Sequence, residues 1–223
     1  INAPGVPSAF VSQNGEIYAY ASGYAYRLFE GSDSSWTYDG SLGGGIGIGS
    51  MEKSVALELG LNYTSIRDSA SGFSVDAAMA RTVYKSERSE IAVGVGSRNA
   101  AAIGLVSSNG ISPYVTSSMI YKYGGTGSMR RVSINAGYGW GQYQKDVFGS
   151  ILPNGYLISV GTDMTKHSAI AVGWAGGVGG LTSAVTLVPY THLPLSIQIG
   201  ASNILQANGG SISPFISIGY GIR

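Results

Sequence analysis

The sequence has no cysteine, little charge and no long apolar run, and each absence narrows the choice of fold. The lack of cysteine in 223 residues excludes a disulfide framework and any cysteine-ligated metal. Charged residues make up only 11% of the chain and nearly balance at +1, so no basic field indicates a nucleic-acid partner. No stretch of about eighteen purely apolar residues occurs, so we expect no membrane-spanning helix.

Charge is also unevenly placed. Residues 167–222 contain no Lys, Arg, Asp or Glu, although a water-exposed surface normally carries charges of both signs. Gly, Pro, Asn or Ser interrupts this stretch every ten or so residues, and apolar residues alternate with small ones in between, as in 216–222. Such a period of two predicts strands with two unlike faces, one of which faces something other than water.

The same alternation runs through most of the chain and predicts about twelve strands. Glycine (35 residues) and tyrosine (15 residues) are unusually frequent in them. Ten strands remain an alternative, because 98–111 and 177–193 are ambiguous. The expected strands are 16–29, 41–50, 53–64, 73–84, 89–97, 112–123, 130–143, 155–165, 168–176, 181–189, 194–204 and 212–222.

The connections between these strands alternate in length over most of the chain. Long polar ones are expected at 30–40, 65–72, 98–111 and 144–154, with short ones between them. This pattern indicates that each strand pairs antiparallel with its sequence neighbour, and a sheet of this size avoids free edges by closing. We therefore predict an all-β fold, a closed up-and-down antiparallel transmembrane β-barrel over 16–223, preceded by a periplasmic segment or plug over 1–15.

The two faces of the strands suit a membrane and a polar lumen. Apolar positions such as Leu57, Leu59 and Leu61 share one face, while Glu58 and most other strand charges fall on the opposite face. Tyrosine and tryptophan gather near strand ends, as expected for interfacial aromatic girdles. The girdle candidates are Tyr18, Tyr26, Tyr63, Tyr84, Tyr121, Tyr123, Trp140, Tyr143, Tyr156 and Tyr220.

Segments 112–115, 135–141 and 214–221 resemble strands of Gram-negative bacterial outer-membrane β-barrel proteins. The likeness covers nearly the whole chain, but it is one of strand style and identifies no subfamily. It implies a mature exported protein in the cell outer membrane, both termini periplasmic, with outer-membrane lipid and the barrel assembly machinery as partners. The chain departs from that family in ending on Gly221-Ile222-Arg223, where such proteins usually end on an aromatic residue.

The face opposite the lipid supplies the candidate functional residues. The lumen of a twelve-stranded barrel is too wide for small side chains to fill, so it holds water or is plugged by a loop or by 1–15. In the first case six polar residues would line a narrow pore; alternatively these charges pair with each other, Arg131 with an acid, and maintain the barrel shape. The six are Glu58, Asp76, Arg131, Asn135, Asp163 and Gln198.

We therefore expect a porin-like channel for passive passage of small solutes, as a monomer or a homo-oligomer. One alternative is a structural or adhesive barrel that presents loops to a partner, with Trp36 and Tyr38 in contact with it; another is a soluble β-rich surface or fibre protein. His167 and His192 lack the His-x-Ser pattern of outer-membrane lipid hydrolases, so no enzyme is expected. No motif indicates a cofactor, and the scattered Asp and His residues indicate no metal site.

Overall fold

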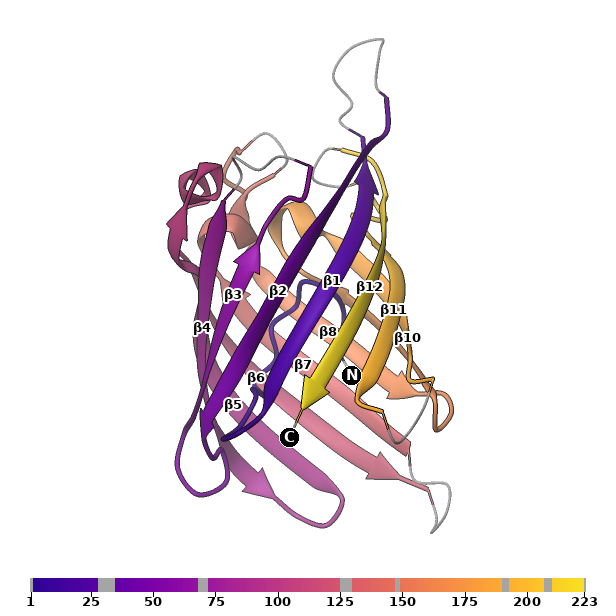
Figure 1. Cartoon of the computed structure of the whole chain (residues 1–223). Helices are drawn as coiled ribbons and strands as arrows, with labels where there is room; N and C mark the ends of the chain where they lie inside the picture. Colours follow the sequence, from indigo (N-terminus) through magenta and orange to yellow (C-terminus); the bar gives the residue numbers. More distant parts are fainter. Residues whose placement is uncertain are drawn as a thin grey trace.

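The protein is described from a computed structural model, which covers residues 2–27, 35–67, 72–124, 130–146, 149–189, 193–206 and 210–222. Twelve strands form a single closed barrel (Figure 1). In chain order they are β1 Ile17–Tyr26, β2 Thr37–Gly49, β3 Ala56–Tyr63, β4 Phe73–Lys85, β5 Ser89–Ile103, β6 Ser112–Tyr123, β7 Arg130–Gly139, β8 Tyr156–Asp163, β9 Ser168–Trp174, β10 Leu181–Leu187, β11 Leu195–Ser202 and β12 Ser213–Ile222.

Every strand pairs antiparallel with its sequence neighbours, and β1 closes the ring by pairing with β12, from Ile17 opposite Ile222 to Tyr24 opposite Phe215. The predicted fold class is confirmed, and the ten-stranded alternative is wrong. Three strand bounds differ markedly from expectation. β2 begins at Thr37 instead of residue 41, so Tyr38, which was expected in a loop, lies in this strand. β5 continues to Ile103 through a stretch that was expected to be loop, and β7 stops at Gly139, followed by a short 3-10 helix, η3 (Gly141–Gln144).

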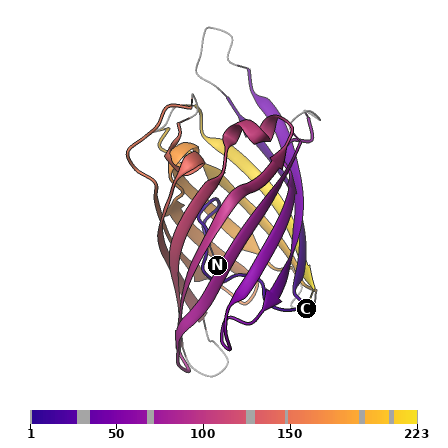
Figure 2. The same cartoon turned by 90° about the vertical axis from the view of Figure 1, so that its left-hand side faces the viewer.

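The two ends of the barrel differ, as the alternation of connections predicts. The connections after β5, β7 and β9 lie at one end and contain the 3-10 helices η2 (Leu105–Asn109), η3 and η4 (Gly177–Gly179). The short turns after β2, β4 and β8 lie at the other end, where the C-terminus also lies (Figures 1 and 2). We call these the long-loop end and the short-turn end.

The outer wall is strongly apolar. Large exposed hydrophobic side chains occur on every strand, and Arg81 on β4 is an outward charge among them, close to the strand's short-turn end. No helix within the described residues is long and apolar enough to cross a membrane. Representative outward residues are Leu42, Ile46, Leu59, Leu61, Met79, Val93, Val95, Val115, Ile134, Ile158, Val160, Ile170, Val172, Ile199, Ile216 and Ile218.

On β1 the tyrosines point inward and the alanines outward, although Tyr18 and Tyr26 were expected in the aromatic girdles. Tyr20 stands opposite Gly43 of β2, which stands opposite Asn62 of β3. The Tyr20 ring lies across Gly43, because a Cβ on this glycine would lie 2.6 Å from the ring, and its hydroxyl donates to Asn62 Oδ1 at 2.6 Å. The Tyr18 ring covers Gly45 in the same way. These glycines therefore leave room for neighbouring rings rather than for empty space.

The prediction of an interfacial girdle position is wrong for three residues. Tyr18 and Tyr26 line cavities inside the barrel, and Tyr143 is buried, edge-on to Tyr114 with ring centroids 6.0 Å apart. Alternation identifies two faces of a strand, but which face turns inward depends on the room that neighbouring strands leave. The remaining candidates include Tyr84 and Tyr156, whose side chains are exposed.

The packing of Tyr20 over Gly43 predicts a measurable coupling. Gly43→Ala should lower the free energy of unfolding by about 1–3 kcal/mol, because the added methyl displaces the ring. The loss should shrink by at least about 0.5 kcal/mol in a Tyr20→Ala background, measured by urea unfolding in detergent micelles. Gly23→Ala is the control, since a Cβ there meets its nearest atom at 3.9 Å. Equal losses in both backgrounds would contradict the packing.

Candidate functional site in the lumen

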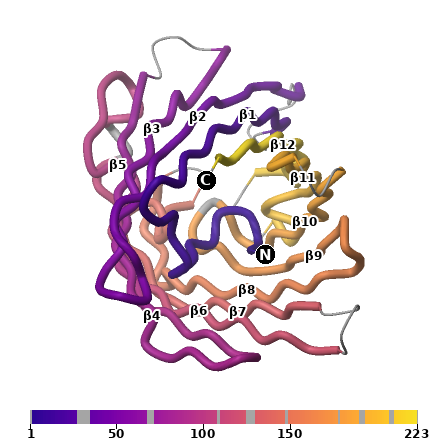
Figure 3. The backbone as a smooth tube through the Cα atoms, turned by 60° about the horizontal axis from the view of Figure 1, so that its bottom comes forward, coloured from indigo at the N-terminus to yellow at the C-terminus, as the bar shows by residue number. Residues whose placement is uncertain are grey.

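The N-terminal residues 2–13 lie inside the barrel (Figure 3). Ala3, Val6 and Ala9 are 2%, 4% and 0% exposed, in two clusters with wall residues. The chain leaves the lumen at the short-turn end, where the Asn14 N–H donates to Gly49 O at 2.8 Å next to the start of β1. We call residues 2–13 the lumen segment.

A row of polar side chains on β6, β7 and β8 holds the lumen segment. Ser118, Asn135 and Ser159 stand opposite one another in register on these strands. Asn135 Nδ2 donates to Asn2 Oδ1 at 2.9 Å and to Ser159 Oγ at 2.9 Å, and Ser159 Oγ donates to Asn2 Oδ1 at 2.6 Å. Ser118 Oγ accepts from the Ala9 N–H at 2.7 Å. Asn135, at 2% exposed, is thus a buried anchor of the segment.

Glycines on the inner face of three strands let the lumen segment approach the barrel backbone. A Cβ on Gly173 of β9 would lie 2.9 Å from Ala3 Cβ, and one on Gly94 of β5 would lie 3.5 Å from Ala9 Cα. Gly47 of β2 is the tightest case, because a Cβ there would overlap the backbone of Ser12 and Gln13. The small inner residues of these strands therefore leave room for the lumen segment.

Glu58 of β3 is occupied by the same segment. Its Oε2 accepts from the Ser12 N–H at 2.7 Å, and its Oε1 accepts from the Tyr18 hydroxyl at 3.1 Å. A carboxylate that accepts a backbone N–H forms a charge-assisted hydrogen bond, which is stronger than a neutral one. Glu58 thus faces the lumen, as predicted, with both oxygens directed to protein donors.

Two adjoining cavities lie between the lumen segment and the long-loop end, and Tyr24, Ser41 and Arg98 line both. The first, of about 730 Å³, is bounded by β1–β5 together with η2 and Gln142 of η3. The second, of about 770 Å³, is bounded by β1, β10, β11 and β12, and by Pro4 and Gly5 of the segment. We call the two together the vestibule.

A bulge in β5 shapes the first cavity. Between Val75 and Ala77 of β4 there is one residue, Asp76, whereas three residues of β5 separate their partners Ala101 and Ser97. Among those three, Asn99 has a φ of 52°, which is rare for a residue with a side chain. Its N–H donates to Asp76 Oδ1 at 2.9 Å, so the carboxylate fixes the bulge. Bulges commonly re-aim side chains next to functional sites.

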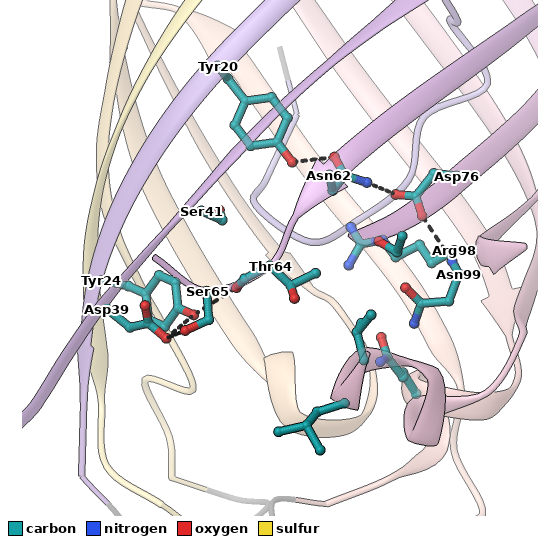
Figure 4. A pocket seen from close by; sticks show the side chains of 14 residues that line it. Tyr20, Tyr24, Asp39, Ser41, Asn62, Thr64, Ser65, Asp76, Arg98 and Asn99 are labelled. Carbon is teal, nitrogen blue, oxygen red and sulfur yellow. Dashed lines mark hydrogen bonds between the residues drawn. The ribbon is translucent and has the colours of Figure 1, made fainter. Parts of the chain in front are cut away.

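Asp76 also joins a chain of hydrogen bonds along the inner wall (Figure 4). Asn62 Nδ2 donates to Asp76 Oδ2 at 3.0 Å, and Asn62 Oδ1 accepts from Tyr20. Closer to the long-loop end, Asp39 of β2 accepts from the Ser65 hydroxyl at 2.6 Å and the Tyr24 hydroxyl at 3.3 Å. The tyrosine hydroxyls are thereby tied to the wall.

Arg98 projects from the bulge to the point where the cavities meet. Its guanidinium lies 5.5 Å from the centroid of the Tyr143 ring, and Nη2 donates to Gly5 O at 3.4 Å. Burial raises the pKa of the Tyr143 hydroxyl, and the neighbouring guanidinium partly opposes this shift. Arg98 therefore touches both the lumen segment and the vestibule.

The six predicted pore-lining residues lie in different parts of the barrel interior. Arg131 pairs with Asp163, Nε to Oδ2 at 2.9 Å, towards the short-turn end. Gln198 donates to Thr186 Oγ1 at 3.3 Å, within the uncharged wall. Asp76 lines the vestibule, and Asn135 and Glu58 contact the lumen segment. The six thus do not form one ring around an open pore.

The sequence prediction missed the residues that shape the vestibule. Tyr20 and Tyr24 are not among the predicted lumen residues, and Arg98 and Asn99 lie in a stretch that was expected to be loop. The run Gly43-x-Gly45-x-Gly47, in the strand that follows a tyrosine-rich strand, is the signal for the inward rings. No sequence signal marks the bulge, which depends on Asp76 of the neighbouring strand.

Other candidate chemistry finds little support. Among the described residues, no group of three or more His, Asp or Glu side chains could hold a metal ion. His167 is exposed in the turn after β8, with Nδ1 3.0 Å from Val188 O. His192, Arg223 and residues 30–34 of the expected long connection lie outside the described residues.

The anchor at Asn135 generates a prediction about the lumen segment. In Asn135→Ala, Asn2 loses its amide partner and the segment should leave the lumen more often. Because the chain has no cysteine, a single Ser8→Cys reports this directly. We expect maleimide to label Cys at position 8 at least about fivefold faster in Asn135→Ala, and at an unchanged rate in the inner-face control Gln198→Ala. Equal rates in all three backgrounds would show that Asn135 does not hold the segment.

Similarity to known proteins is found in structure and not in sequence. No protein-family model matches the chain, and no curated protein matches it in sequence. Among solved structures, an outer membrane channel from Pseudomonas putida F1 is similar, with 11% identity, a TM-score of 0.44 and coverage of 95% of this chain and 97% of that one. The attachment invasion locus protein Ail of Yersinia pestis follows at 7% identity and a TM-score of 0.27, covering 94% and 100%. Neisserial surface protein A has 11% identity and a TM-score of 0.23, covering 94% and 99%. The chain is a closed twelve-stranded barrel of no identified subfamily, and these solved structures that it resembles are outer-membrane and surface proteins.

Proposed function

We propose that the protein is an outer-membrane channel for small polar solutes, and that the lumen segment keeps this channel closed until it is displaced. The membrane placement is supported by the apolar outer wall, which a water-soluble barrel would not present on every strand. The closed ladder also leaves no free strand edge, which counts against the alternative of a fibre built by edge pairing.

The observation that carries the channel proposal is the way the lumen is filled. The interior contains polar side chains and a short segment of small residues, in place of a fully packed apolar core. The segment is held by apolar contacts of Ala3, Val6 and Ala9 with the wall. It is also held by hydrogen bonds to Ser118, Asn135, Ser159 and Glu58, each worth about 0.5–3 kcal/mol net. Water can replace these hydrogen bonds, and displacement of the lumen segment would open a polar passage.

The orientation follows the usual arrangement of such barrels. We place the C-terminus and the short-turn end, through which the N-terminal chain enters the lumen, on the periplasmic side, with the long-loop end and vestibule outside the cell. Outer-membrane lipid and the barrel assembly machinery are the partners this placement requires. Among the described residues that face the lumen we identify no catalytic arrangement, and we propose no enzymatic activity.

A second candidate function is partner binding at the long-loop end. Trp36 lies directly before β2 and Tyr38 lies within it, and they are 45% and 69% exposed. The start of β2 extends beyond the barrel rim (Figure 1). The Arg27 guanidinium lies 5.7 Å from the Trp36 ring centroid. Exposed aromatic and arginine side chains are enriched where proteins bind partners.

Deletion of the lumen segment tests the channel proposal. In planar bilayers the full chain should show small or rare conductance steps, whereas the variant lacking residues 2–13 should show steps several times larger. Unboiled migration on SDS gels verifies that both barrels are folded. A folded deletion variant that never conducts at any voltage would rule out a channel.

The lipid-facing assignment has its own test. Leu59→Arg places a cation near the middle of the outer apolar band and should destabilise the protein in phospholipid vesicles by about 2–4 kcal/mol. Gln198→Arg is the matched control, because its side chain points into the lumen and should cost far less. Equal costs for the two substitutions in vesicles would contradict the membrane placement.

A further inference from the structure

We propose that the vestibule binds an uncharged polyhydroxylated solute, such as a small oligosaccharide. This inference rests on the proposed channel and names the class of solute that it admits. It is carried by the first cavity, where the ring of Tyr20, the Asp76 carboxylate, the Arg98 guanidinium and the Asn99 amide line one volume (Figure 4).

The size and depth of this cavity suit a small molecule. Its volume of about 730 Å³ falls within the range of roughly 300–1,000 Å³ usual for small-molecule sites. The lumen segment lies beneath the vestibule, and Pro4 and Gly5 line its second cavity. A solute that entered from the long-loop end would thus be retained before it met the closure.

The tyrosines provide flat surfaces held in place. The Tyr20 ring covers Gly43 and its hydroxyl bonds to Asn62, while the Tyr24 hydroxyl bonds to Asp39. With one side against the wall and the hydroxyl tied, the Tyr20 ring offers its free face to the cavity. A sugar ring carries C–H groups on one face and hydroxyls at its edge, which suits an aromatic surface bordered by polar groups.

The polar groups around these rings retain hydrogen-bonding capacity. An ionised carboxylate accepts at about four sites, and within the described residues Asp76 accepts from Asn62 Nδ2 and the Asn99 N–H. A guanidinium has five N–H donors, and in the same part of the chain Arg98 donates one long bond, to Gly5 O. Donors and acceptors thus lie side by side, which is the combination that adjacent hydroxyl groups require.

Other solute classes fit this site less well. An apolar molecule would leave Asp76 and Arg98 desolvated without new partners, which is costly. An anion would be attracted by Arg98 but repelled by Asp76 and Asp39. A cation would be attracted by the two carboxylates but repelled by Arg98. A neutral polyol avoids both repulsions and satisfies both charges.

Binding can be measured on the full chain in micelles of an amine-oxide detergent, which has no sugar headgroup to compete. Isothermal titration with maltotriose should show saturable binding, and a polyethylene glycol of similar size should not bind. Asp76→Asn should weaken maltotriose binding at least about tenfold, because a hydrogen bond to a charged group is lost. Asn99→Gly removes the amide while favouring the left-handed backbone at this position.

Gln206→Gly is the matched control for Asn99→Gly. Gln206 has a φ of 54° but lies in the connection after β11, outside the vestibule lining. We expect Asn99→Gly to lower affinity several-fold and Gln206→Gly to leave it unchanged. Unboiled gel migration confirms that each variant remains a folded barrel, so a loss of binding is not a loss of fold.

The outcomes separate this inference from the channel itself. If the deletion variant conducts but maltotriose neither binds the full chain nor reduces conductance, the solute assignment is wrong and the channel stands. If maltotriose binds equally well to wild type, Asp76→Asn and Asn99→Gly, the site is not the vestibule and the inference is overturned. If binding follows the prediction while no variant conducts, the site is supported and the channel proposal fails.

Discussion

A ring of twelve strands encloses more space than small side chains can fill, and the interior of this protein is a response to that constraint. Closure between β1 and β12 satisfies the backbone, but it leaves a wide lumen lined largely by Gly, Ala and Ser. Two kinds of material occupy part of that lumen. Tyrosine rings from β1 lie flat across β2, and the N-terminal residues run through the centre.

These two fillings divide the lumen into regions of different character. The rings are fixed by hydroxyl bonds to Asn62 and Asp39, so they behave as part of the wall. The lumen segment rests on glycines and is held by polar contacts to Asn135 and its neighbours. Ala3, Val6 and Ala9 add apolar contacts with the wall, and the polar contacts are hydrogen bonds that water can replace when the segment is displaced. The vestibule exists because the segment supplies part of its lining.

Much of the fold follows from local pattern, because strand alternation and the lengths of connections are local properties of the sequence. Strand number, closure and the lipid face of β3 were predictable on that basis. The inward turn of Tyr18 and Tyr20 was not, since it depends on glycines in the next strand. The bulge at Asn99 depends likewise on Asp76 of β4, and the burial of Asn135 depends on a segment more than a hundred residues away.

The uncharged stretch 167–222 forms one side of the lumen. Its strands β9–β12 present Gly173 to the lumen segment, and Thr182, Ser202 and Ser213 to the second cavity. The charged residues of the vestibule come instead from β2, β4 and β5 and from Arg27, directly after β1. A solute in the vestibule would therefore meet a charged hydrogen-bonding wall on one side and a neutral hydroxyl wall on the other, with Arg98 reaching between them. Such asymmetry favours one orientation of a neutral polar solute and needs no charge on the solute itself.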